Sequence, residues 1–194
     1  MRLGLDMLGV SYKYVTGYRS SAPARIAFQR NEISMYSESP PSYRSAVVPS
    51  LVDTGQAIGV WYDDVDDSDN APGLKQMEGL PVPTYPQLHR QIRGTKPSGM
   101  MWEAFKTLFN VNSTLQRLIV LPPTAPRTAY DALSAAIGRI NHDKEFAAEA
   151  MKLIQFVPEY PVGPNMSNTV RGMLVATPEM RKYINEYMKN VPKR

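Results

Sequence analysis

Three short runs of β-branched and aromatic residues stand in the first third of the chain, separated by polar segments. Their alternation and composition are typical of β-strands, at residues 11–16, 33–36 and 56–62. Between them, residues 21–30 and 40–48 have the composition of short helices. Ser20 or Ser21 can cap the first helix, and its first turn tolerates Pro23 because an N–H there has no partner within the helix. The order strand, helix, strand, helix, strand predicts a βαβαβ unit around a parallel sheet.

Helical periodicity dominates the later part of the chain. Apolar residues recur every three or four positions in the segments 87–93, 99–110, 128–141 and 166–175. Asp143 can cap a further helix that reaches Ile154, and Thr177 followed by Pro178 begins the last one. Two more strands are predicted at 115–121 and 156–160. We therefore expect the second half to consist of helices packed on a second sheet.

The stretch from 63 to 86 breaks this regularity. Aspartate comes first, at positions 63, 64, 66, 67 and 69, and proline and glycine follow. A calcium-binding loop that began at Asp67 would have Glu78 at its twelfth position. However, Ala71 and Pro72 stand where such a loop needs an acidic residue and a glycine. We interpret the stretch as a solvated excursion and predict no metal site.

Composition and charge exclude several classes of partner. Lys and Arg total 22 against 18 Asp and Glu, a net charge of +4, and the basic residues are scattered, so no nucleic-acid partner is expected. The chain has no Cys, which excludes disulfides and thiolate sites. No run approaches the roughly 18 apolar residues of a membrane span, so the chain is not expected to be membrane-embedded. Residues 1–6 do not have the pattern of a signal peptide.

Enzymatic motifs are not found in the sequence. The two histidines, His89 and His142, are far apart. The sequence has no H-E-x-x-H, G-x-S-x-G, Walker A or G-x-G-x-x-G pattern. We predict no catalytic residue and no cofactor, and we expect a binding protein rather than an enzyme.

Four segments carry a family resemblance. The chain has Y-V-T-G-Y-R-S-S-A-P-A at 14–24, Q-R-N-E-I-S at 29–34, L-P-P-T-A-P at 121–126 and I-N-H-D-K-E-F at 140–146. In this order and spacing they resemble the tripartite tricarboxylate transporter receptor family, with its Y-K-G-S-A-P-A turn, G-G-Q-V-D step, A-P-A-G-T-P segment and L-x-D-P-E-F helix joint. The match covers nearly the whole chain but only the later portion of such a receptor.

The resemblance implies an α/β fold like that of type II periplasmic binding proteins, with two lobes, parallel-type sheets and a ligand cleft. In this chain the first lobe is expected to be incomplete. Residues 1–112 would form mostly the second lobe, with the acidic excursion 63–86. Residues 113–194 would form a crossover strand and C-terminal helices that return to the first lobe. The implied function is extracytoplasmic: a periplasmic receptor that captures a small organic anion for the membrane permease of a tripartite tricarboxylate-type transporter.

The turn before the first helix is the first candidate binding loop. It offers free N–H groups, the positive end of a helix dipole and serine hydroxyls to a carboxylate. Its predicted ligand-binding residues are Gly17, Tyr18, Ser20, Ser21 and Ala22. The alternative is that the serines only cap the helix.

A second candidate loop contains Ser37, Glu38 and Ser39, again after a predicted strand. Both loops are expected at one edge of the sheet, where ligands of open α/β folds bind. Glu38 suits an amine or hydroxyl group of the solute, or is simply a solvated carboxylate. Trp61 and Trp102 are assigned to packing.

Other functions are possible on the sequence alone. The chain could be the ligand-sensing effector domain of a transcription regulator, since such domains share the expected architecture, or an enzyme of unknown chemistry. It could also be a non-functional truncated fragment of a receptor, in which apolar faces would be left exposed.

Overall fold

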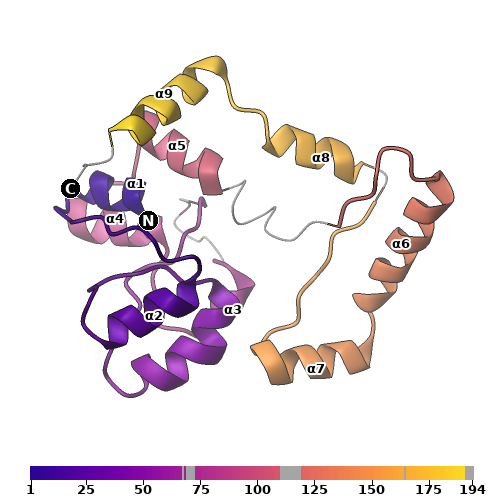
Figure 1. Cartoon of the computed structure of the whole chain (residues 1–194), viewed down its shortest axis with the longest axis horizontal. Helices are drawn as coiled ribbons and strands as arrows, with labels where there is room; N and C mark the ends of the chain where they lie inside the picture. The colour runs from indigo at the N-terminus through magenta and orange to yellow at the C-terminus, as the bar shows by residue number, and fades with distance from the viewer. Residues whose placement is uncertain (67, 69–72, 110–118, 164, 191–194) are drawn as a thin grey trace.

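The computed structural model describes residues 1–66, 68, 73–109, 119–163 and 165–190. Helices form most of the regular structure in this part of the chain (Figure 1). Their order is α1 (Arg2–Leu8), α2 (Ser21–Gln29), α3 (Pro40–Ser42), the π-helix η1 (Tyr43–Val52), the 3-10 helix η2 (Lys75–Met77), α4 (Tyr85–Arg93), α5 (Gly99–Phe109), α6 (Arg127–Ile140), α7 (Lys144–Ile154), α8 (Met166–Met173) and α9 (Pro178–Lys189).

The predicted α/β class, with two lobes and parallel-type sheets, is wrong. Across the described residues no sheet forms, and the predicted strands are irregular chain at 11–16, 33–36, 56–61, 119–121 and 156–160. One isolated β-bridge joins Tyr62 to Thr84 in parallel. The rest of the predicted strand 115–121, and the predicted boundary between residues 112 and 113, lie outside the described residues.

The bridge shows why strand-like composition did not produce a sheet here. The Tyr62 N–H donates to the Pro83 carbonyl at 3.0 Å, and the Tyr85 N–H donates to the Tyr62 carbonyl at 2.9 Å. The partner segment contains Pro81 and Pro83, and neither has an N–H to continue a ladder. The pairing therefore stops after one residue.

Most predicted helices are confirmed, because helical hydrogen bonds are local. Helices α2 and α5 to α9 lie within a few residues of the predicted ranges, and the caps by Asp143 and Thr177 are present. Helix α1 was not predicted. Helix α4 begins two residues before the predicted start, at a capping box in which Thr84 and Gln87 each accept the other's N–H.

The helix predicted at 40–48 extends beyond its predicted end and includes Pro49. Helix α3 continues directly into η1, which passes Pro49 and ends at Val52. A proline inside a helix lacks the N–H for the i−4 carbonyl and its ring crowds that carbonyl, which the wider π-helical turn accommodates. The Asp53 N–H donates to the Val48 carbonyl at 2.9 Å, five residues back.

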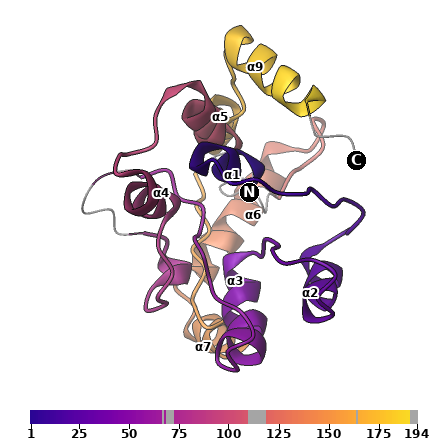
Figure 2. The ribbon, with the colours of Figure 1, turned by 90° about the vertical axis from the view of Figure 1, so that its left-hand side faces the viewer.

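The main core lies where α1, α4, α5 and α9 meet, and Figures 1 and 2 both show α1 beside α4 and α5. Its buried members are apolar or aromatic: Leu3, Leu8, Tyr85, Trp102, Ala104, Phe105 and Met180. The first and last described helices therefore pack in the same core. None of the described helices is both long and apolar enough to cross a lipid bilayer.

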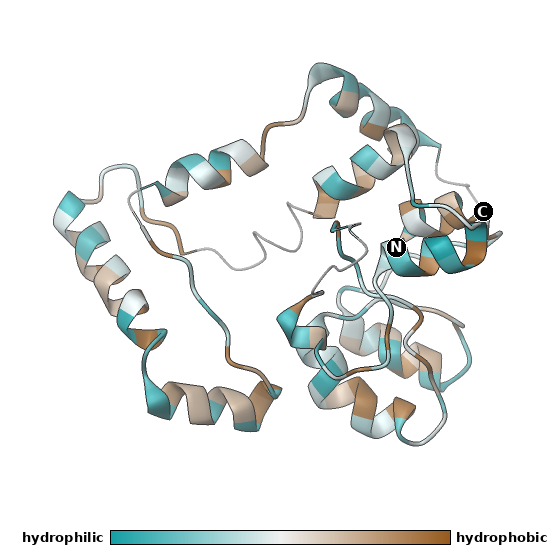
Figure 3. Ribbon diagram, turned by 180° about the vertical axis from the view of Figure 1, so that it is seen from behind, coloured by the Kyte–Doolittle hydropathy of each residue, from teal (hydrophilic) through white to brown (hydrophobic). Residues whose placement is uncertain are grey.

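Helices α6, α7 and α8 form an arc away from this core, at the right of Figure 1. Helix α7 contacts η1, and Lys75 pairs with Glu159 at 2.8 Å. Figure 3 shows apolar positions among the polar ones on these helices, yet α6 and α8 bury no residue and α7 buries only Ala150. Among the apolar residues of α6 and α7, Leu133 and Met151 are 41% and 52% exposed.

Replacing Asp143 with alanine should destabilise α7 by about 1 kcal/mol, the usual cost of losing an N-cap. The Asp143 side chain accepts the N–H groups of Glu145 at 2.8 Å and Phe146 at 3.1 Å. Amide hydrogen exchange should quicken in α7. Asp131→Ala, which removes an exposed pair with Arg127 at 3.0 Å, is the control and should leave α7 unchanged. Equal exchange in both variants would contradict the capping role.

Candidate functional site

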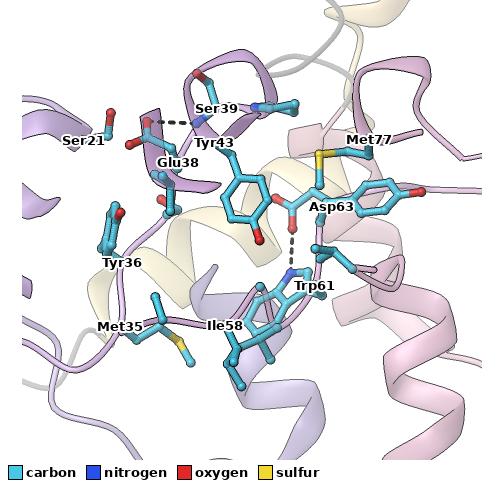
Figure 4. Close-up of a pocket in the computed structure, with 18 of the residues that line it drawn as sticks. Ser21, Met35, Tyr36, Glu38, Ser39, Tyr43, Ile58, Trp61, Asp63 and Met77 are labelled. Atoms are coloured by element: carbon cyan, nitrogen blue, oxygen red, sulfur yellow. Dashed lines mark hydrogen bonds between the residues drawn. The ribbon is translucent and has the colours of Figure 1, made fainter. Parts of the chain in front are cut away.

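A pocket of about 1070 Å³ opens between α2, η1, η2 and the chain that leads to Asp63. Figure 4 shows its lining side chains, with Ser21, Glu38 and Ser39 at one side and Trp61, Asp63 and Met77 at the other. Aromatic and apolar side chains form most of the wall, including Phe28, Tyr36, Tyr43, Val47, Trp61, Tyr62, Met77 and Val82. Such a wall with a few polar groups is typical of small-molecule sites.

The two predicted binding loops both reach this pocket, although no sheet edge brings them together. Ser37, Glu38 and Ser39 line it, and so does Ser21. The other predicted residues of the first loop do not line it and are exposed: Gly17, Tyr18, Ser20 and Ala22. Of the predicted binding residues in the Gly17–Ala22 turn, Ser21 alone therefore lines the pocket.

Glu38 is buried and incompletely hydrogen-bonded. Its side chain is 6% exposed, and its Oε1 accepts the Ser39 N–H at 3.2 Å. Its Oε2 lies 3.6 Å from Arg25 Nη1, which is ion-pair distance but too long for a hydrogen bond, and neither atom has another hydrogen-bond partner. Buried oxygens usually have a partner, so Glu38 Oε2 can still accept a donor.

Two tyrosines line the pocket: Tyr36 on the side of Glu38, and Tyr43 between Glu38 and Asp63 (Figure 4). The Tyr36 hydroxyl is buried without a hydrogen-bond partner. Burial raises the pKa of Tyr36, and the nearby Glu38 carboxylate raises it further. Burial also raises the pKa of Tyr43. Gly59 passes so close to Tyr43 that a Cβ there would lie 2.5 Å from the tyrosine Oη, which fixes that ring against the wall.

The side of the pocket around Asp63 was missed by the sequence interpretation, which placed Asp63 in a solvated excursion and Trp61 in packing. Asp63 Oδ1 accepts the Trp61 Nε1–H at 2.9 Å, and both residues line the pocket. The available signal was the order of residues, because Asp63 begins the acidic run directly after the aromatic residues Trp61 and Tyr62. Tyr62 beside it is held by the bridge to Thr84.

Other candidate chemistry is not assembled in the described part of the chain. No group of three or more His, Asp or Glu side chains there is arranged to hold a metal ion. His89 is buried, and its Nδ1 lies 2.7 Å from the Thr95 carbonyl, so this ring acts in packing near the end of α4. Neither histidine lines the pocket.

Comparisons of the chain with protein-family models, with curated proteins and with solved structures gave no match.

Proposed function

We propose that this chain is a receptor that binds a small carboxylate-containing solute, without covalent chemistry, in the pocket between α2 and η1. The observation that carries the proposal is the meeting of Ser21 with Ser37, Glu38 and Ser39 in one largely aromatic pocket. These residues belong to two loops that are separated in the sequence, and the sequence predicts each loop as a binding loop.

The N-terminus of α2 can hold the carboxylate. Ser20, its N-cap, makes no side-chain hydrogen bond to the helix, and no acidic residue stands in the first turn. The first N–H groups of a helix lack partners within the helix and carry partial positive charge, which favours an anion. Ser21, which lines the pocket, adds a hydroxyl group.

Glu38 does not prevent this arrangement, because Arg25 neutralises it. The guanidinium and the carboxylate are 3.6 Å apart, and both side chains are mostly buried, at 20% and 6% exposure. Opposite charges this close reduce each other's field outside the pair. The Ser21 side of the pocket is therefore close to neutral, and the helix N-terminus decides which charge it prefers.

The resemblance to tripartite tricarboxylate transporter receptors supports a proposal for the location and the transport role of this chain. In that family the receptor works in the periplasm and delivers its solute to a membrane permease. We propose the same role and location for this chain.

Isothermal titration calorimetry with a panel of organic acids, including 4-methylbenzoate and succinate, tests the binding function. We expect saturable binding of at least one carboxylate to the full chain. Ser21→Ala should weaken it about 10-fold, because the variant removes one hydrogen bond to a charged group.

Ser20→Ala is the matched control, since Ser20 is adjacent but exposed and outside the pocket. Its affinity should equal that of the wild type. Binding of no carboxylate, or equal loss of affinity in the two variants, would contradict the proposed site.

A further inference from the structure

We propose that the solute also carries a protonated amine, and that Asp63, oriented by the Trp61 N–H, binds it beside the ring of Tyr43. This inference rests on the proposed function and adds a second recognition point at the opposite side of the pocket. The solute class is then an amine-bearing carboxylate whose two charged groups are separated by an apolar or aromatic body.

The charge of the lining is the first argument. Among the described residues that line the pocket, the carboxylic acids are Glu38 and Asp63, and no side chain is a lysine, arginine or histidine; Met1, which carries the α-amino group, is also part of the lining. Glu38 is neutralised by Arg25. No ion pair joins Asp63 to another described residue, the Met1 amino group included, and within the described part of the chain the Trp61 N–H is the one hydrogen-bond donor to its carboxylate. The Asp63 side of the pocket is therefore negative.

The surroundings of Asp63 are the second argument. Figure 4 shows its carboxylate among Tyr43, Trp61 and Met77. Aromatic faces attract cations, and the attraction grows where water is excluded. Trp61 turns its N–H edge toward one oxygen of Asp63, so the other oxygen can accept a charged hydrogen bond from an ammonium group, and the Tyr43 ring beside it can add a cation–π contact.

The form of the pocket is the third argument. Ser21 and Glu38 lie on one side and Asp63 on the other, so one small group cannot contact both. The volume of about 1070 Å³ and the apolar wall between the two sides suit an uncharged body such as an aromatic ring. A second carboxylate on the solute would face Asp63 and be repelled.

Three probes with one skeleton test the inference by calorimetry on the full chain: 4-(aminomethyl)benzoate, 4-methylbenzoate and 4-methylbenzylamine. We expect 4-(aminomethyl)benzoate to bind about 10-fold more tightly than 4-methylbenzoate, since one charge-assisted contact is added. Asp63→Asn should remove this preference and leave 4-methylbenzoate binding unchanged. Asparagine keeps an oxygen for the Trp61 N–H, so the fold is retained. Asp53→Asn, at an exposed position outside the pocket, is the control.

The outcomes separate this inference from the proposed function. If 4-methylbenzoate binds as tightly as 4-(aminomethyl)benzoate, the amine site is wrong and the carboxylate receptor stands. If 4-methylbenzylamine binds in an Asp63-dependent way while 4-methylbenzoate does not bind, the amine site stands and the carboxylate function fails. If none of the three binds, both are overturned.

Discussion

Replacing Tyr85 with alanine should lower the free energy of unfolding by about 3–5 kcal/mol, the cost of deleting a buried aromatic side chain. Tyr85 is fully buried, at 0% exposure, and its ring stacks on Phe105 with centroids 4.8 Å apart and on Trp102 at 6.0 Å. Its hydroxyl donates to the Gly4 carbonyl at 2.9 Å. The substitution would therefore open a cavity where α1, α4 and α5 meet.

Urea unfolding at neutral pH measures this loss. Tyr85→Phe keeps the ring and should cost about 1–3 kcal/mol, because the Gly4 carbonyl loses its donor. Tyr18→Ala, at an exposed position, should change stability by no more than about 0.5 kcal/mol. If Tyr85→Ala loses no more than about 1 kcal/mol, the level of an ordinary substitution, the core assignment is wrong.

Tyr85→Ala should also weaken solute binding. The Tyr85 and Trp61 rings meet edge to face with centroids 5.9 Å apart, and alanine removes this contact while it keeps the backbone hydrogen bond from residue 85 to the Tyr62 carbonyl. Tyr85 therefore connects the main core to the pocket wall that carries Trp61 and Asp63.

Replacing Asp6 with alanine should lower the free energy of unfolding by about 2–4 kcal/mol, because two hydrogen bonds to a charged acceptor are lost. Asp6 Oδ1 accepts the Tyr12 hydroxyl at 2.9 Å, and Oδ2 accepts the Tyr187 hydroxyl. The Arg2 guanidinium covers the Tyr187 ring at 4.8 Å from its centroid. Asp6 thus fixes α9 to α1, and amide exchange in α9 should quicken when it is removed.

This prediction has a defined pH dependence. Burial raises the pKa of Tyr187, and the hydrogen bond to Asp6 raises it further. A group whose pKa is higher in the folded state stabilises that state fully below its unfolded pKa, about 10 for tyrosine, and loses the contribution as pH rises above it. The stability difference between wild type and Asp6→Ala should therefore shrink above pH about 10. Asp53→Ala, at an exposed position, should match the wild type throughout; a constant difference for Asp6→Ala would contradict the proposed link.

Local signals in the sequence predicted the helices correctly. The predicted strands did not form, because a strand depends on pairing with a distant segment. Asp143 and Thr177 marked two helix starts because an N-cap bonds to residues two or three positions away. The Thr84–Gln87 capping box is the same kind of local signal, and it marks the start of α4 two residues before the predicted start. A strand needs a partner elsewhere in the chain, and for residues 56–62 the available partner contains Pro81 and Pro83.

The candidate site was predicted in part for the same reason. Ser21 and Ser37 to Ser39 stand at helix starts, where local chemistry already suggests an anion or a cap. The role of Asp63 depends on the distant Tyr43 and on the neutralisation of Glu38 by Arg25, which no short window of sequence contains. Burial and charge balance of a pocket follow only from its three-dimensional assembly.

Tryptophan fluorescence during titration with 4-(aminomethyl)benzoate tests the central claim, that the solute occupies the pocket between α2 and η1. Trp61 lines this pocket, whereas Trp102 is 2% exposed in the main core. We predict a saturable change of emission in the full chain and almost none in Trp61→Phe, which keeps Trp102. The same change in both proteins, or calorimetric binding with no change of emission in the wild type, would place the solute elsewhere and contradict the claim.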